Sequence, residues 1–393
     1  MVFPLFQQGQ LLDQLNNGTI CHSLPSIICA VSAKARETYF WHRDMDVDAE
    51  LSCLAESATI DSENATEPLA LNQWRTACLL AWYCFHQTPG NGEAIRIALL
   101  TRKAYQCGLH QIDSAHDKAS FGWDSIGEET LEDWRHVWWC ISILDCHASF
   151  LTATPHQVEP ESMRTALPQN TTPPDPSQNP PSRKFHLPSD RASLWKVVQE
   201  ISSTEGDKTF GLHMAISTLL REVVTLRRLQ IQSPCQSIQE RTSVLQDHLS
   251  AVQLALPRNY MSQTRNIIQG ESDASYHCRL LTVLKIYSTR LVLCSQLRSL
   301  DSSQWDGRWQ ENLDICQHMV AVIQQWDIQS MPAIDPAVCF ITLAVLVMLH
   351  LHTLSSGVSR PQLREQLTRR KDIVKLFLHS YATWTLPRFL LGI

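Results

Sequence analysis

Hydrophobic side chains recur at intervals of three and four residues along most of the chain, with polar side chains between them. This spacing gathers the hydrophobic side chains on one face of an α-helix, whereas the alternation typical of β-strands is rare. The pattern predicts an all-α protein, a multi-helix bundle or a superhelical array of helices. In the first half, helices are expected at residues 5–15, 24–35, 47–58, 71–86 and 94–107.

A tryptophan-rich segment, residues 128–150, is the strongest helix prediction, with three tryptophans in six residues. Thr130 is expected to cap its start, with Asp133 three positions later. One face of the expected helix carries Trp134, Trp138, Ile141, Asp145 and Ala148. Because the other face is also largely hydrophobic, this helix is expected to be buried among other helices.

Asp145 is the one acidic residue on that hydrophobic face. A carboxylate in an apolar interior needs an arginine, several hydrogen-bond donors, or a proton. One interpretation is a catalytic acid or metal ligand, and the other is a structural ion pair between packed helices. The second is favoured, because no further carboxylate or histidine lies at helical spacing on that face.

The second half shows the same periodicity. Helices are expected at residues 212–226, 276–294, 309–323, 337–352 and 362–381. Asp335 is expected to cap the fourth of these, with Pro336 in its first turn. The longest hydrophobic run, residues 337–349, is short for a membrane span and predicts a buried helix.

A proline-rich segment separates the two halves, since nine of the 19 prolines lie between Pro155 and Pro188. Proline at this density, with few hydrophobic residues, opposes both helix and strand. The chain is therefore expected to comprise an N-terminal helical half (1–154), a linker or surface loop (155–190) and a C-terminal helical half (191–393).

Composition narrows the class of protein. The chain has 393 residues, only 13 glycines and a formal net charge of −6, which argues against a nucleic-acid surface spread over the whole molecule. Its 13 cysteines are scattered singly, a pattern typical of reduced intracellular thiols. No signal peptide is evident at the N-terminus.

Motifs for catalysis are missing from the sequence. There is no phosphate-binding Gly-x4-Gly-Lys loop, no Gly-x-Ser-x-Gly elbow and no His-Glu-x-x-His pair. His350 and His352 are two residues apart on an expected helix, so they point in different directions and cannot share a metal ion. No cofactor and no metal site is expected. The basic residues between Arg364 and Lys375 are interpreted as a solvated helix face.

Two motifs occur in an order that resembles the middle homology region of fungal binuclear zinc-cluster transcription factors. The stretch from Ala104 to His110 is similar to that family's A-x-x-x-G-L-H motif. The stretch from Trp134 to Asp145 is similar to its R-R-x-x-W-W-x-x-x-x-x-D helix. The resemblance implies an all-α regulatory domain that covers most of the chain.

The sequence departs from the family pattern in two places. The Gly-Arg-Pro that usually follows the tryptophan helix is reduced to Pro155, and the six paired cysteines of the zinc cluster are missing. The chain is therefore expected to be a member without its DNA-binding module, or the product of a truncated gene model.

The resemblance implies a transcription regulator in the nucleus that is not an enzyme, and specialised-metabolite genes are its suggested targets. It would act through another regulator, a homo- or heterodimer partner or a small-molecule effector, with no direct DNA binding and no membrane contact. The family's aspartate corresponds to Asp145, and a buried ion pair with Arg290 is expected. Two alternatives stay open: an all-helical biosynthetic enzyme with an unrecognised pocket, and a corepressor or scaffold that dimerises with an intact zinc-cluster factor.

Overall fold

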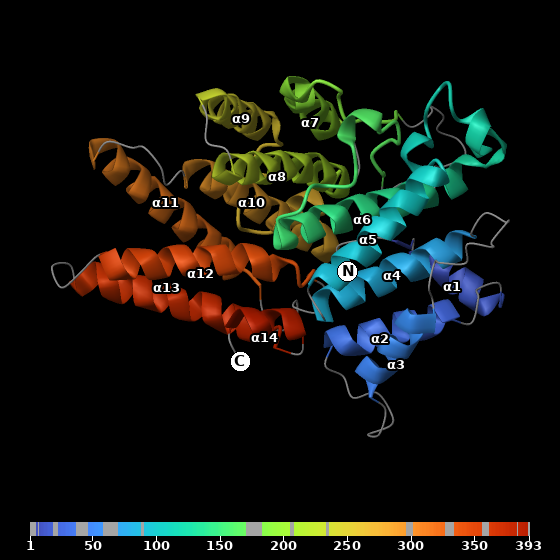
Figure 1. Ribbon diagram of the computed structural model, residues 1–393, viewed down its shortest axis with the longest axis horizontal. Coiled ribbons are helices and arrows are strands. Elements are labelled where there is room, and N and C mark those ends of the chain that lie inside the picture. Colours follow the sequence, from blue (N-terminus) through green and yellow to red (C-terminus); the bar gives the residue numbers. More distant parts are fainter. Residues whose placement is uncertain are drawn as a thin grey trace. The chain divides into compact units, whose positions relative to one another are not determined.

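A computed structural model describes most of the chain (Figure 1). The described ranges are residues 5–6, 8–18, 23–36, 46–57, 70–87, 90–169, 183–204, 208–232, 236–295, 302–326, 334–355, 361–382 and 384–391. Within these ranges the chain forms fourteen α-helices and six short 3-10 helices, with no strand. The prediction of an all-α, multi-helix fold is confirmed.

The chain divides into two compact units. Within the described ranges, unit 1 comprises residues 5–169 and 183–189, and unit 2 comprises residues 190–391. The described flanks of the proline-rich segment, residues 155–169 and 183–189, therefore belong to unit 1. They bury Val158, Ala166 and Phe185, and they form one short 3-10 helix, Pro160–Ser162. The most proline-dense part, residues 170–182, lies outside the described residues.

Unit 1 is built around α4, which packs against four other helices of the unit. Its helices are α1 (Gln8–Asn16), α2 (Ser23–Arg36), α3 (Val47–Ser57), α4 (Leu71–Gln87), α5 (Asn91–Gln106) and α6 (Glu128–Thr152). Every residue of α4 from Trp74 to His86 is buried. The tryptophan-rich α6 packs against α4 and α5, and Trp138 and Trp139 are almost completely buried. Burial of α6 on both faces matches its hydrophobic pattern.

Unit 2 is centred on the pair α8 and α10, which make the most extensive helix–helix contact in the described chain. Its helices are α7 (Leu194–Ser203), α8 (Thr209–Gln232), α9 (Gln236–Ala255), α10 (Asp273–Cys294), α11 (Ser302–Ile323), α12 (Val338–Ser355), α13 (Pro361–His379) and α14 (Thr385–Leu391). α7 and α9 pack together beside α8, and α12 lies along α13 (Figure 1). The sequence pattern did not predict α7, α9 or α14.

The ends of three helices can be compared with the capping and turn residues near them in the sequence. Gly108 follows α5 in the left-handed conformation, as its position predicts. The Asp335 carboxylate accepts a hydrogen bond from the Ala337 amide at 2.9 Å, but α12 begins only at Val338, so Asp335 closes the turn before the helix and Pro336 lies outside the first helical turn. The Thr130 cap is wrong: α6 begins at Glu128 after Gly127, and Thr130 lies inside the helix. The extra turn has a physical reason, because it lets Glu128 reach Arg135 two turns further along.

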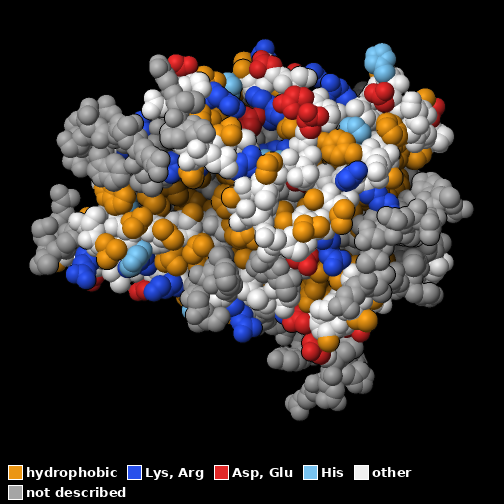
Figure 2. Space-filling model, viewed as in Figure 1, with side chains coloured by type: hydrophobic (Ala, Val, Ile, Leu, Met, Phe, Trp, Pro, Cys, Tyr) orange, Lys and Arg blue, Asp and Glu red, His pale blue; other side chains and the backbone are white. Residues whose placement is uncertain are grey.

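α12 is the one described helix that is long and hydrophobic enough to cross a membrane, with a mean hydropathy of 2.0 over Val338–Ser355. Length and composition alone do not show that α12 crosses a membrane, because core helices of soluble proteins can be equally long and hydrophobic. The helix was expected to be buried, but it is buried on one face only, and Val347, Leu351 and Leu354 are exposed on the other. Figure 2 shows hydrophobic side chains gathered over α12, with basic side chains along α13.

The first prediction concerns Gly108, whose backbone φ is +71° and which lies against the Phe121 ring. A Cβ atom at Gly108 would lie 2.2 Å from Phe121 Cγ, so Gly108→Ala must displace the ring. Gly122 is the matched control, because its φ is +75° and nothing lies within 4 Å of its Cβ position. Both changes cost about 1–2 kcal/mol of left-handed strain, and Gly108→Ala is expected to cost about 1 kcal/mol more in urea unfolding. Equal losses for the two variants would show that the ring does not constrain this turn.

Candidate functional site

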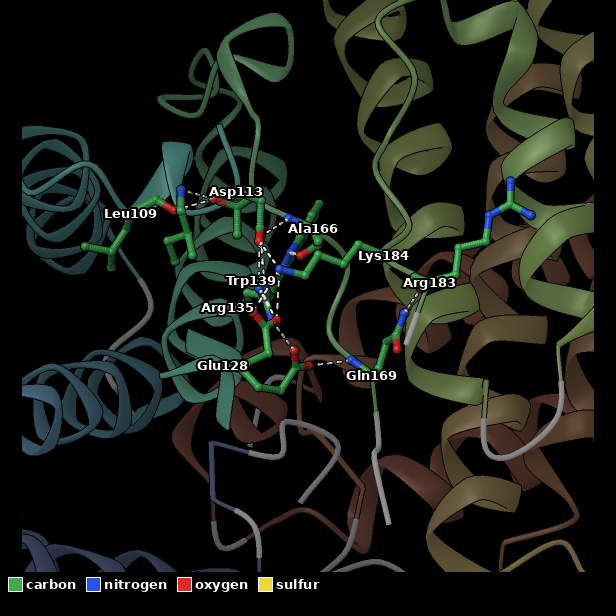
Figure 3. A network of polar contacts seen from close by, with 12 residues as sticks. Leu109, Asp113, Glu128, Arg135, Trp139, Ala166, Gln169, Arg183 and Lys184 are labelled. Atoms are coloured by element: carbon green, nitrogen blue, oxygen red, sulfur yellow. Dashed lines mark hydrogen bonds and ion pairs between the residues drawn. The ribbon is translucent and has the colours of Figure 1, made fainter. Parts of the chain in front are cut away.

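The Arg135 guanidinium is the centre of the main polar network of unit 1 (Figure 3). Its side chain is 2 % exposed. It binds both carboxylate oxygens of Asp113, from Nε at 2.8 Å and from Nη2 at 2.6 Å. Nη1 donates to Glu132 at 2.7 Å, and Nη2 lies 2.7 Å from a Glu128 oxygen. We call these four residues, together with Lys184, the Arg135 network.

Three separate stretches of chain supply the Arg135 network. Glu128, Glu132 and Arg135 lie on α6 at spacings of four and three residues, so they share one helix face. Asp113 follows the short η1 helix (Leu109–Gln111), and Lys184 lies in the C-terminal flank of the proline-rich segment. Lys184 Nζ lies 3.0 Å from an Asp113 oxygen and 2.9 Å from a Glu128 oxygen. With two cations and three carboxylates, the network carries a formal charge of 2 − 3 = −1.

Charge complementarity keeps Arg135 and Asp113, the two most buried members of the network, ionised. Burial raises the pKa of Asp113, but hydrogen bonds from Arg135 and the Ala166 amide outweigh burial and hold this pKa well below its usual range. Burial lowers the pKa of Arg135, and its bonds to Asp113 and Glu132 more than reverse this effect. For Glu132, burial dominates and raises the pKa despite bonds from the Gln169 amide and Arg135. The guanidinium and the Asp113 carboxylate are therefore charged at neutral pH.

The network holds the backbone of residues 163–169. The Ala166 amide donates to Asp113 at 2.9 Å, and the Gln169 amide donates to Glu132 at 2.5 Å. The Trp139 indole donates to the Ala166 carbonyl at 2.7 Å. The Thr165 hydroxyl donates to the Leu109 carbonyl at 2.6 Å. These hydrogen bonds hold residues 163–169, which have no regular secondary structure, against α6. We call this segment the strap, and the role of these polar side chains is structural.

The two motifs that resemble the zinc-cluster family meet in this region. Tyr105 contacts Trp138 edge-to-face, with ring centroids 5.5 Å apart, and His110 packs beside both rings. The Trp123 indole donates to the Gly108 carbonyl at 3.0 Å, and its ring meets Trp134 at 5.4 Å. Burial lowers the pKa of His110, so this imidazole is neutral at pH 7.

A second buried ion pair joins α4 to α6. Arg75 Nη2 lies 2.8 Å from an Asp133 oxygen, with the two side chains 2 % and 8 % exposed. Arg75 also donates to the Leu5 carbonyl at 2.9 Å. Nearby, complete burial, followed by the charges of Arg75 and Arg135, lowers the pKa of His136 to about 3. His136 is therefore a neutral core histidine.

Asp145 is buried as predicted, at 2 % exposed, whereas its expected partner Arg290 belongs to the other unit, so their ion pair stays a prediction. Its two oxygens accept hydrogen bonds from the Gln157 amide at 2.9 Å and the Val158 amide at 3.1 Å. Arg290 is about half exposed on α10 and lies 3.2 Å from Glu311 in its own unit. Donors from the backbone therefore serve the carboxylate where an arginine was expected, and Asp145 fixes the turn after α6.

In unit 2, Arg279 has a role similar to that of Arg135. Its side chain, 3 % exposed, lies 2.7 Å from Glu271 and donates to the carbonyls of Tyr260, Ser262 and Thr264. One guanidinium thus holds the connection between α9 and α10. This role leaves little of its donor capacity for a ligand.

A buried cluster on α8 and α10 brings together a lysine, a histidine and a serine, which are residue types found in catalytic sites. Lys285 Nζ lies 3.0 Å from His213 Nε2 and donates to the Ser217 hydroxyl at 2.8 Å. The Thr282 hydroxyl gives its proton to the Cys278 carbonyl, so His213 Nδ1 must donate to Thr282 and Nε2 accepts from the lysine. Ser217 donates to the His213 carbonyl and is 8 % exposed. The hydroxyl is therefore held inside the helix pair.

Metal binding has no support in the described ranges, where no group of three or more histidine, cysteine, aspartate or glutamate residues could hold an ion. The cysteines described there are all free thiols.

The Arg135 network was not predicted from the sequence. Glu128, Glu132 and Arg135 at spacings of four and three are a signal that could have been found on the helix. Asp113 and Lys184 gave no comparable signal, because only the fold brings them to α6.

The second prediction concerns the acid limb of stability. Because the folded pKa of Asp113 is depressed, its contribution is present above its unfolded pKa of 3.8 and is lost as the pH falls. Glu132, whose folded pKa is raised, opposes this trend. The free energy of unfolding of Asp113→Asn is expected to fall less steeply than that of the unmodified chain between about pH 4 and pH 2, measured by urea titration.

Asp124→Asn, at an exposed position in the η3 helix (Trp123–Ser125), is the control and should keep the full slope. Parallel curves for Asp113→Asn and the unmodified chain would contradict the charge assignment.

The third prediction concerns Asp145→Asn. This change keeps one acceptor oxygen but turns an amide NH2 toward one of the two backbone N–H groups, where it cannot accept. We expect a loss of about 1–3 kcal/mol in the free energy of unfolding, against almost no loss for Asp124→Asn. An unchanged unfolding midpoint for Asp145→Asn would mean that the Gln157 and Val158 amides do not depend on the carboxylate.

Comparisons with known proteins assign no family. No protein-family model matches the chain, and neither a curated protein nor a solved structure matches it.

Proposed function

We propose that this chain is the regulatory domain of a transcription regulator of the fungal zinc-cluster type, acting in the nucleus without a zinc cluster of its own. Specialised-metabolite genes are its proposed targets. Because the sequence holds no Cys-x-x-Cys pair, DNA reading must come from a partner regulator, a dimer partner or another segment. The domain itself would respond to that partner or to a small-molecule effector.

One observation carries the proposal: the two motifs behind the resemblance lie in contact and serve as scaffold. Tyr105 and His110 of the first motif pack on Trp138 of the second. The polar residues of the second motif, Arg135 and Asp145, are engaged with carboxylates and backbone amides. Motifs used in this way support a domain that binds and transmits rather than one that catalyses a reaction.

An all-helical enzyme is the second candidate, because Lys285 lies 2.8 Å from the Ser217 hydroxyl. A lysine next to a serine is the arrangement of Ser-Lys hydrolases. The Ser217 hydroxyl donates to a helix carbonyl inside the α8–α10 contact, which favours a structural role. A fluorophosphonate probe separates the two, since it labels an activated serine and leaves a structural one unmodified.

The fourth prediction tests regulation directly. The whole chain, fused to a heterologous DNA-binding domain in a fungal host, is expected to change transcription of a reporter that carries the matching sites. The same DNA-binding domain alone is the control. Deletion of the gene should change transcript levels of neighbouring biosynthetic genes.

A stable, nuclear fusion that leaves the reporter unchanged, together with unaltered transcripts after deletion, would reject the regulatory function. Labelling of Ser217 by the fluorophosphonate in the same protein would then favour the enzyme.

A further inference from the structure

A cleft in unit 2 lies where α9, α10 and α11 converge. It has a volume of about 390 Å³. This is at the lower end of the range of about 300–1,000 Å³ typical of small-molecule sites, which suits a molecule with a single ring or the size of an amino acid. The lining residues that the structure describes come from these three helices, so the cleft belongs to the packing of unit 2.

Charged side chains gather on one side of the cleft. Arg290 from α10 and Arg308 and Glu311 from α11 line it, with a formal charge of 2 − 1 = +1. Arg290 and Glu311 are 3.2 Å apart, and their side chains are 47 % and 41 % exposed. A half-exposed ion pair contributes little net stability, so it can open at little cost when a ligand offers each partner a better one.

The α9 wall of the cleft is unusually polar. Gln246, Leu249, Ser250 and Gln253 follow one another at spacings of three, one and three residues, so they share a single helix face. A face turned toward two other helices normally carries hydrophobic residues. Here, two amide side chains provide both donors and acceptors, and Leu249 with Leu293 provides the hydrophobic surface.

Cys294 completes the site next to the carboxylate. Burial, followed by the nearby charge of Glu311 and a hydrogen bond to it, raises the pKa of the Cys294 thiol to about 12. Such a thiol stays protonated at neutral pH and is a poor nucleophile. The cleft therefore offers recognition groups: two planar cations, one anion, amides and a small hydrophobic surface.

We propose that this cleft binds a small carboxylate that also carries a hydrogen-bond donor, such as a hydroxyl or an ammonium group. The ligand carboxylate pairs with the arginines, because guanidinium matches its geometry. The hydrogen-bond donor of the ligand binds the Glu311 carboxylate. The side-chain amide of Gln246 or Gln253 on α9 forms a further hydrogen bond with the ligand. The role of this ligand as an effector rests on the proposed function. Binding of the ligand to the cleft does not depend on that function.

The fifth prediction uses three probes on the full chain: salicylate, L-tyrosine and citrate, with salicylamide as the uncharged counterpart of salicylate. Isothermal titration is expected to show saturable binding of at least one probe and none of salicylamide. Arg308→Gln should weaken that binding by about tenfold or more, because a charge-assisted hydrogen bond is lost. Arg241→Gln, on an exposed position of α9 outside the cleft, should leave it unchanged.

Arg308→Lys is the second variant and guards against a folding defect, since it keeps the charge but loses the planar fork. It should bind more weakly than the unmodified chain and more tightly than Arg308→Gln, with an unchanged circular dichroism spectrum. The proposal is overturned if none of the probes binds at about 10 mM, or if Arg308→Gln and Arg241→Gln bind equally well.

Failure of this proposal and failure of the proposed function are distinguishable. Arginine-dependent binding with a silent reporter would keep the ligand site and reject regulation. An active reporter without binding of any probe would keep regulation and reject this cleft as the effector site.

Discussion

The buried guanidinium of Arg135 is the constraint on which the rest of unit 1 depends. Removing such a charge from water is costly unless every donor finds an acceptor. The acceptors are the carboxylates of Asp113, Glu132 and Glu128. Asp113 also accepts a hydrogen bond from the Ala166 amide, and Glu132 accepts one from the Gln169 amide. One charged group thus joins α6, the connection after α5 and the strap that follows α6. The tryptophans fill space around this joint, and the ion pairs determine its geometry.

Unit 2 repeats the same physical solution with different residues. Arg279 on α10 holds the long α9–α10 connection through Glu271 and three carbonyl groups. In each unit, a helix whose hydrophobic pattern ensures burial also carries an arginine that fastens a segment without regular structure. The polar groups with freedom to rearrange are found elsewhere, in the half-exposed Arg290–Glu311 pair of the unit 2 cleft. This contrast between engaged and adaptable polar groups is the basis for placing ligand recognition in that cleft.

Sequence signals that act within a few residues predicted helices and turns. They did not predict which residues, distant in the sequence, contact one another in the fold. Periodicity identified most helices, and Asp335 was recognised ahead of α12 because turn chemistry acts within a few residues. The Thr130 cap failed because the helix begins at Glu128, whose carboxylate pairs with Arg135 seven residues later, and capping rules consider only the first turn. For Asp145, the hydrophobic pattern predicts burial but does not say which donors reach the carboxylate. Those donors are backbone amides of a proline-rich segment, where periodicity carries no information.

Hydrogen exchange at the strap tests the central claim most directly. In Arg135→Lys the charge remains, but the five-donor fork that organises Asp113 and Glu132 is lost. If the guanidinium holds the strap, the amides of Ala166 and Gln169 should exchange at least about tenfold faster in this variant, while the amides of α4 stay protected. Unchanged exchange at Ala166 and Gln169 would show that packing alone holds residues 163–169, and that Arg135 is not the constraint described here.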